Sequence, residues 1–388
     1  MLAGMVVVGR LYDPAEFGEY GVFAAFSAIA SVMVTLRLDL AVPLGHDNGE
    51  MRQIAAASLV MAAMICTTVF GVMLLWNRAI PGVAIGRSGL LLLPLSILLG
   101  AARSTLNQFA VALGEFRVIG RRAVAQSVAM VLVQVVWGAC GLMGPGLVIG
   151  YIFGQLTACV MYVMSVGLPL VKPHHLIGVY REFRQYMMVM APQGAINSLG
   201  TQLPLITVSW LYQSDVVGLF SMTQKVMGMP VGLVSTAMSQ VYISFAAARR
   251  RENGVSVKGL FFRVSKSLAL ISCILVLVIW AIGPWLFTSV LGQEWRVSGH
   301  YAQLMVVLFA AQMIAVPVST TLIIGRREKT QLAWDAARMG SVLVIFMSAR
   351  YWDFSPEAYV MLVALVLSIA YLVLWELSRR VVVSPVSC

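Results

Sequence analysis

Long apolar stretches of about 20 residues or more recur along the whole 388-residue chain. A helix of about 20 residues crosses a hydrocarbon core of about 30 Å. A transmembrane β-barrel would instead show short segments of alternating polarity. The fold class is therefore expected to be all-α and polytopic. The pattern predicts eleven full spans, at residues 19–43, 54–76, 89–113, 123–144, 147–170, 186–210, 216–246, 267–290, 301–324, 332–350 and 357–378.

An apolar stub, MLAGMVVVG, occupies residues 1–9. Nine helical residues rise about 14 Å, roughly half of the hydrocarbon thickness, so the stub is too short to span. It has neither the basic start nor the A-x-A site of a signal peptide. We expect a first helix that is shortened at its N-terminus, either by a late start codon, with the missing apolar residues encoded upstream, or by a real deletion.

A polar elbow occurs twice in this apolar chain. The segments RLYDPAEFGEYGVFAAF (10–26) and WLYQSDVVGLFSMTQKV (210–226) align without a gap. A weaker echo links GEFRVIGRRA (114–123) with GRREKTQLAW (325–334). Two homologous halves of six helices, related by an axis along the membrane normal, explain both echoes. Chance similarity between tight elbows is the alternative.

The duplication predicts a carrier built from two pseudo-symmetric six-helix lobes around a central cavity. The N-terminal lobe is expected at residues 1–171 and the C-terminal lobe at 187–388. A cytoplasmic linker at 172–186 would join them.

The positions of the charged residues along the chain, and not the net charge, are informative about its topology. Charged residues make up 11% of the chain, compared with about 25% in globular proteins, and the formal net charge is +11. Of the 27 Lys and Arg residues, 18 lie in one set of alternate loops, 5 in the other set and 4 within spans. This bias places the richer set in the cytoplasm and both elbows on the outer side. The basic balance therefore indicates membrane topology and not nucleic-acid binding.

Ionisable groups inside a membrane cost about 2.5–3.5 kcal/mol each, so each needs a reason to be there. Lys225 lies near mid-membrane beside Gln224, and we expect both to face a cavity. Arg103 and Asn107 are one helical turn apart and share a face. They predict a polar stripe facing the same cavity, with structural pairing as the alternative.

Arg37 and Asp39 lie near the expected cytoplasmic end of the first full span. Side chains two residues apart on a helix cannot pair with each other, so each needs another partner. For Asp39, pairing at a gate and coupling to an ion are both open. Asn197 and Gln202 add hydrogen-bonding capacity near the start of the second half.

The other polar residues do not indicate catalysis or metal binding. Asp335 and Arg338 are three residues apart on one helix face and are expected to neutralise each other. His174 and His175 are adjacent, with no third metal ligand nearby. The sequence shows no nucleotide-binding loop and no cluster of acids. We expect no catalytic residue, metal or cofactor.

Four segments in order, LYDPAEFGEYG, LRLDLAVPL, VGLFSMTQKVMGMPVGLVSTAMSQVYISF and LGQEWRVSGHYAQLM, resemble the successive signatures of Wzx-type bacterial oligosaccharide flippases. These are polysaccharide biosynthesis proteins of the multidrug/oligosaccharidyl-lipid/polysaccharide (MOP) exporter superfamily. The resemblance runs from Gly9 to the end of the chain. It implies two six-helix bundles around a cationic cavity, with Arg37, Asp39 and Lys225 at recurrent charged positions.

The resemblance also implies a substrate and a setting. An undecaprenyl-pyrophosphate-linked glycan repeat would move from the cytoplasmic to the periplasmic leaflet of the bacterial inner membrane. The product would be a surface polysaccharide such as O-antigen, capsule or exopolysaccharide. Polysaccharide polymerase and chain-length proteins would be partners, together with the lipid bilayer.

Three other functions are alternatives to a polysaccharide flippase. A drug or cation exporter of the same superfamily would favour acids in the cavity, whereas three of the four in-span charges outside the Asp335–Arg338 pair are basic. A peptidoglycan-precursor flippase fits the motifs less well. A membrane polymerase or ligase would need a large outer loop, and the expected outer connections are short. A transporter rather than an enzyme is expected.

Overall fold

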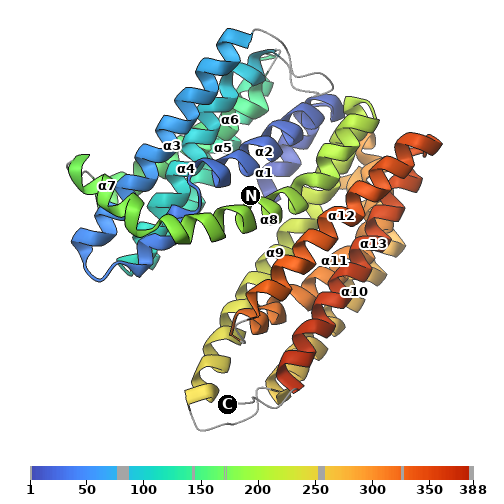
Figure 1. Cartoon of the computed structure of the whole chain (residues 1–388). Coiled ribbons are helices and arrows are strands. Elements are labelled where there is room, and N and C mark those ends of the chain that lie inside the picture. The colour runs from blue at the N-terminus through green and yellow to red at the C-terminus, as the bar shows by residue number, and fades with distance from the viewer. Residues whose placement is uncertain are drawn as a thin grey trace. The chain divides into compact units, whose positions relative to one another are not determined.

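The structure is a computed structural model that describes residues 2–76, 87–141, 145–169, 171, 173–251, 258–324 and 327–383. These residues form helices joined by short turns (Figure 1), and the described ranges contain no strand. The all-α prediction is therefore confirmed. The chain divides into two compact units, Ala3–Trp210 and Leu211–Cys388.

The first unit contains eight α-helices and one 3₁₀ helix within the described residues. They are α1 (Leu2–Leu11), α2 (Pro14–Val34), η1 (Leu38–Leu44), α3 (Asn48–Trp76), α4 (Arg87–Ala112), α5 (Phe116–Ala139), α6 (Gly146–Val166), α7 (Pro173–Glu182) and α8 (Arg184–Leu211). The apolar core of this unit is centred on η1, whose Leu38, Ala41 and Val42 are fully buried. A short helix that is buried in this way can place polar neighbours inside the unit.

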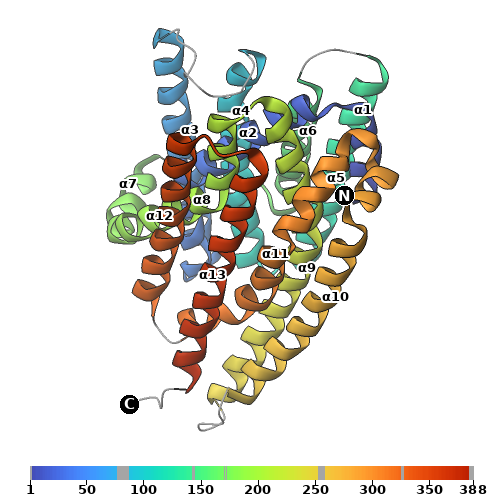
Figure 2. The same ribbon diagram turned by 90° about the vertical axis from the view of Figure 1, so that its right-hand side faces the viewer.

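The second unit is organised around a central helix. Its described elements are α9 (Ser214–Arg251), α10 (Lys258–Leu291), η2 (Gln293–Trp295), α11 (Arg296–Ile324), α12 (Glu328–Trp352) and α13 (Pro356–Val383). Helix α11 packs against α9, α10 and α13 (Figure 2). Its Tyr301, Phe309 and Met313 are buried in this packing.

The described part of the chain has eleven helices of 21 residues or more, and each overlaps one predicted span. Nine of them are long and apolar enough to cross a membrane by length and composition. The remaining two are α8 and α9, which are interrupted by Pro192, Pro204 and Pro230. Both also carry the polar residues that the sequence singles out. The polytopic arrangement is therefore supported, and the two helices that fall short of this criterion are adjacent in the chain.

Two expected boundaries differ in the structure. The span predicted at 19–43 ends at Val34, because Leu36 and Arg37 adopt positive φ angles of 46° and 60°. The chain then continues as η1, so Arg37 and Asp39 lie in a tight turn and a 3₁₀ helix rather than at the end of a membrane helix. No glycine marks this left-handed turn, which is why the sequence did not reveal it.

The segment expected as a linker, 172–186, is largely helical. It contains α7 and the first residues of α8. Helix α7 is fixed to α3, since Tyr180 Oη donates to the carbonyl oxygen of Ala57 at 2.8 Å. Helix α8 groups with the first unit, although the sequence assigned it to the C-terminal lobe. The division into homologous lobes stays a prediction.

The two elbows have the same local structure. A helix ends at Leu11 or Leu211, two residues turn, and the next helix begins at Pro14 or Ser214. Tyr12 Oη donates to the carbonyl oxygen of Gln134 at 2.7 Å, and Tyr212 Oη donates to that of Phe354 at 2.9 Å. Gln134 lies in α5, and Phe354 lies in the turn between α12 and α13.

Burial raises the pKa of Tyr12 and the pKa of Tyr212 to about 12, so both phenols stay protonated and can donate at neutral pH. Each elbow is thereby fixed to a later helical hairpin of its own unit. This repeated contact is what duplicated halves predict.

We predict that Tyr12→Phe and Tyr212→Phe each lower the free energy of unfolding by about 1 kcal/mol, because the first removes a buried hydrogen bond, the second removes a part-buried one, and both leave the ring in place. Unfolding of the purified protein in detergent measures the effect. Tyr351→Phe is the control, since that side chain is 80% exposed. Equal stability of all three variants would contradict the role assigned to the elbows.

Candidate functional site

Asp39 is the buried acid of the first unit, with 2% of its surface exposed. Ser104 Oγ of α4 donates to its Oδ2 at 2.6 Å, and Thr35 Oγ1 donates to its Oδ1 at 3.1 Å. Thr35 Oγ1 also lies 3.1 Å from the carbonyl oxygen of Val32, so its single proton is shared. Ser104 is therefore the stronger donor. The 2.6 Å length of its hydrogen bond to Asp39 is typical of a bond to a charged oxygen. Two hydroxyl groups compensate the burial of this carboxyl group.

Arg37 lies against helix α8. A Cβ atom on Gly194 would overlap its Nε and approach its Cγ and Cδ, so the guanidinium arm crosses the backbone where α8 has no side chain. Tyr186 of α8 is within electrostatic range of both Arg37 and Asp39. The structure thus brings Arg37 and Asp39 together with the start of α8.

Arg103 and Asn107 share one face of α4, as the sequence predicts, and that face meets α6. Arg103 Nε donates to Gln155 Oε1 at 3.2 Å. Tyr162 Oη donates to Asn107 Oδ1 at 2.5 Å. Both contacts are made to neutral partners on α6, so the pairing does not cancel the charge of Arg103.

Lys225 and Gln224 belong to the second unit and are half-buried, and the Nζ atom of Lys225 is shielded from solvent. Just before them, Thr223 Oγ1 donates to the carbonyl oxygen of Ser298, and Ser298 Oγ donates to that of Leu219, both at 2.9 Å. These reciprocal bonds fix α9 on α11. Lys225 follows eleven residues after Ser214, about 16 Å along the helix axis.

Asn197 and Gln202 both lie on α8, with Asn197 exposed and Gln202 half-buried. They are therefore in the same unit as Arg37, Asp39, Arg103 and Asn107, whereas Lys225 and Gln224 are in the other. The predicted site residues form two groups, one in each unit.

The expected pairing of Asp335 and Arg338 is confirmed. Arg338 Nη2 lies 3.1 Å from Asp335 Oδ1, and both side chains are buried. Arg338 Nη1 also donates to Tyr371 Oη at 3.0 Å, and its Cζ lies 4.8 Å from the centre of the Trp334 ring. This pair joins α12 to α13 and is structural.

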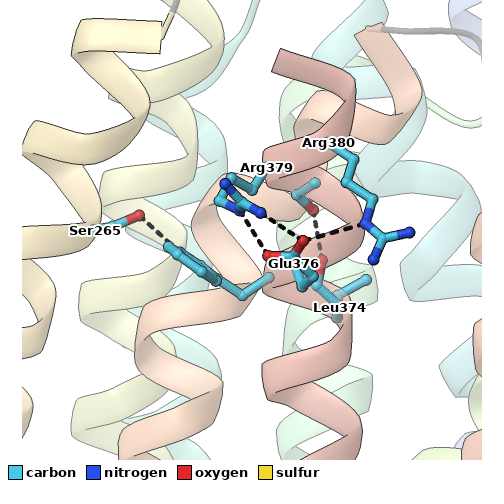
Figure 3. Close-up of polar contacts among 7 residues, drawn as sticks. Ser265, Leu374, Glu376, Arg379 and Arg380 are labelled. Atoms are coloured by element: carbon cyan, nitrogen blue, oxygen red, sulfur yellow. Dashed lines mark hydrogen bonds and ion pairs between the residues drawn. The ribbon is translucent and has the colours of Figure 1, made fainter. Parts of the chain in front are cut away.

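A second charged group lies near the end of α13 (Figure 3). Glu376 accepts hydrogen bonds from Arg379 at 2.6 and 2.7 Å and from Arg380 at 3.1 Å. The neighbouring Trp375 Nε1 donates to Ser265 Oγ of α10 at 3.0 Å. These partly exposed ions are solvated, so their pairing contributes little to stability.

Four residues that bond to the predicted site residues were not predicted from the sequence: Ser104, Arg122, Gln155 and Tyr162. Arg122 lies just before the span predicted at 123–144, yet the structure places it in α5, and its Nη2 is 3.4 Å from Asn107 Oδ1. A signal existed for Gln155, a 1% exposed amide in an otherwise apolar helix. Ser104 and Tyr162 gave none, because hydroxyls are common in membrane helices. The residues that the structure describes contain no group of three His, Cys, Asp or Glu side chains that could hold a metal.

Comparisons with known proteins identify the family of the chain. A model of the family described as "Polysaccharide biosynthesis protein" matches residues 7–300. The teichuronic acid biosynthesis protein TuaB of Bacillus subtilis is 21% identical over 141 residues, which cover 36% of this chain and 29% of TuaB. The amylovoran biosynthesis protein AmsL of Erwinia amylovora is 20% identical over 209 residues, which cover 54% of this chain and 52% of AmsL. The matches thus span about a third and about half of these relatives.

Solved structures identify the fold. The lipid II flippase MurJ in an inward closed conformation superposes with a TM-score of 0.69 at 10% identity, covering 98% of this chain and 86% of MurJ. An inward-facing multidrug resistance MATE transporter of the MOP superfamily gives 0.65 at 13% identity, covering 98% of this chain and 93% of the transporter. The chain is therefore a multi-pass membrane protein with the MOP fold.

We predict that Asp39 and Ser104 are energetically coupled. In a double-mutant cycle of Asp39→Ala and Ser104→Ala, the coupling free energy should be about 1.5–3 kcal/mol, as for hydrogen bonds to charged groups. Unfolding of the purified variants supplies the four values. Ser96→Ala is the matched control, because Ser96 is a buried hydroxyl of α4 that bonds to Ser27 instead. Additive effects for both serines would show that Asp39 is held by other groups.

Proposed function

The chain belongs to the polysaccharide biosynthesis protein family, and on that premise we propose that it is a lipid-linked oligosaccharide flippase of the bacterial inner membrane. Its cargo would be an undecaprenyl-pyrophosphate glycan repeat, moved from the cytoplasmic to the periplasmic leaflet. The repeat would then enter a surface polysaccharide such as O-antigen, capsule or exopolysaccharide. The names of TuaB and AmsL, both in the biosynthesis of bacterial polysaccharides, support this class of product.

The observation that carries the proposal is the balance of charge among the candidate site residues. Arg37, Arg103 and Lys225 are half-buried cations, whereas Asp39 is a buried acid that hydroxyl donors already satisfy. A pyrophosphate is a multiply charged anion that arginine and lysine bind well. A cation exporter would need the opposite balance. The interior is therefore suited to an anionic head group.

We place the transport pathway between two pseudo-symmetric six-helix lobes, at residues 1–171 and 187–388. The matching elbows at Tyr12 and Tyr212 support the symmetry. The polar residues of α8 and of α9 support a water-filled pathway, since irregular and polar helices in membranes are tolerated where they border water. Substrate contacts are assigned to Lys225, Gln224, Arg103, Asn107, Arg37, Asp39, Asn197 and Gln202.

The membrane potential would drive this export. Each negative charge that moves outward gains about 2.3 kcal/mol per 100 mV of inside-negative potential. A dianionic head group is therefore drawn to the outer leaflet without ATP. A peptidoglycan precursor bears the same pyrophosphate, so a precursor flippase is the second candidate, and the MurJ-like fold suits either cargo.

Complementation of a polysaccharide flippase-null strain tests the proposal, scored by surface polysaccharide per amount of membrane-extracted protein. Rescue of this strain, and not of a strain that lacks its peptidoglycan-precursor flippase, is the expected outcome. The reverse result would assign the chain to the second candidate. Rescue of neither would contradict a flippase function.

Within this assay, Lys225→Ala should abolish export and leave folded protein in the membrane. Lys225→Arg should keep part of the activity, since it keeps the charge and changes the geometry. Lys225→Glu should export less than Lys225→Ala, because the introduced carboxylate repels the anion in a poorly screened space. Normal export by both the Ala and the Glu variant would make the lysine structural.

A glycine substitution tests the contribution of Arg37. In Gly194→Ala the new methyl group would displace the Arg37 guanidinium, so we expect export to fall as far as in Arg37→Gln. Gly178→Ala is the control, because a Cβ at that position meets open space. Full export by Gly194→Ala together with loss in Arg37→Gln would show that the observed arginine position is not the active one.

A further inference from the structure

Two arginines from different helices converge on one seam inside the first unit. Arg103 of α4 bonds to Gln155 of α6 at 3.2 Å. Arg122 of α5 donates from Nη1 to Gln126 Oε1 at 2.6 Å and from Nη2 to Asn107 Oδ1 at 3.4 Å. Its Cζ lies 5.2 Å from the centre of the Tyr162 ring. We call Arg103, Asn107, Arg122, Gln126, Gln155 and Tyr162 the arginine seam.

The seam carries positive charge that its own partners do not cancel. Both guanidinium groups act electrostatically on the Tyr162 hydroxyl and the Cys159 thiol, and no carboxylate is among the described groups that do so. In the ranges that the structure describes, neither arginine takes part in an ion pair. Glu115 lies between the two arginines in the sequence but is exposed, and the buried carboxyl group of Asp39 is bonded to Ser104. Amide oxygens and a ring face are weak compensation for two cations close together.

One donor of the seam is left over. The Nε–H of Arg122 is shielded from solvent and has no hydrogen-bond acceptor among the described residues. A buried donor without an acceptor is costly, and for a charged group the cost is larger. An anion between the arginines would supply the acceptor and the missing negative charge together.

The position of the seam suits a ligand that arrives from one side. Arg122 lies six residues from the start of α5 and Arg103 nine residues before the end of α4, so they are about 9 and 14 Å from the turn that joins these helices. The distribution of basic residues predicts that this turn is cytoplasmic. Arg122 would therefore be met before Arg103 by a group that enters from the cytoplasm.

We propose that the arginine seam is an anion site for a phosphate-bearing group, which is the pyrophosphate of the lipid-linked cargo on its way in. The identity of this anion rests on the proposed function. The same chemistry would bind the phosphodiester of a bilayer lipid. Planar guanidinium groups bind phosphate oxygens through paired hydrogen bonds, and Tyr162 and Asn107 hold Arg122 in position for this.

Binding of inorganic pyrophosphate to the purified full chain in detergent tests the site by calorimetry. Arg122→Gln and Arg103→Gln should each weaken binding at least about tenfold, since each removes a charged contact. Arg121→Gln is the matched control, because it removes the neighbouring charge from an exposed position and should bind as the native chain does. Arg122→Lys should fall between, and it keeps the test decisive if the glutamine variant does not fold.

A second arm distinguishes the source of the phosphate. Thermal unfolding is measured in nanodiscs of phosphatidylglycerol and of phosphatidylcholine without pyrophosphate. Stabilisation by phosphatidylglycerol that Arg122→Gln removes, in a protein that does not bind pyrophosphate, would assign the seam to bilayer lipid. Equal pyrophosphate binding by Arg122→Gln, Arg103→Gln and Arg121→Gln, or no binding and no lipid effect, would overturn the proposal.

Failure of this inference differs from failure of the proposed function. Pyrophosphate binding that depends on Arg122, in a chain that rescues no flippase-null strain, would leave the site and remove the function. Rescue by Arg122→Gln at the native level, without pyrophosphate binding by the native chain, would leave the function and remove the site.

Discussion

Hydrocarbon offers no hydrogen-bond partner, so each polar group that enters the membrane part of this chain must be satisfied by protein or by a water-filled space. Asp39 meets this constraint through the hydroxyl of Thr35, in the turn before η1, and the hydroxyl of Ser104 in α4. Arg103 meets it through an amide on α6. The bonds from Ser104 and Arg103 join elements that are distant in sequence. The polar residues therefore also determine how the helices of the first unit pack.

The kind of partner separates structural charges from those available to a substrate. Arg338 is bonded to a carboxylate, so its charge is cancelled and it serves to join α12 and α13. Arg103 and Arg122 are bonded to neutral amides, which satisfy donors and leave the charge in place. A transporter of an anion needs the second kind of cation, held in position without being neutralised. The family to which the chain belongs and its MOP fold supply the setting for such a role.

Sequence reasoning recovered features that depend on local pattern. Eleven apolar stretches became eleven long helices, and the repeated Leu-Tyr elbow became the same turn at Tyr12 and Tyr212. The turn at Leu36 and Arg37 was not predicted, because non-glycine residues adopt its positive φ angles. The pairing of Arg103 with Gln155 and of Ser104 with Asp39 also escaped, since these partners are 52 and 65 residues apart. Tertiary packing, and not periodicity, decides such contacts.

The account depends on movement of an anionic, lipid-linked glycan under the membrane potential. The direct measurement is transport in proteoliposomes that contain the purified chain and an undecaprenyl-pyrophosphate oligosaccharide, with an imposed potassium diffusion potential. A periodate-type reagent that reacts only with outward-facing sugars reports the fraction in the outer leaflet. The account predicts that this fraction rises under an inside-negative potential and returns to an even distribution when the potential is collapsed, since each charge gains about 2.3 kcal/mol per 100 mV. An outer fraction that stays the same at either sign of the potential, as it should in liposomes without the protein, would contradict it.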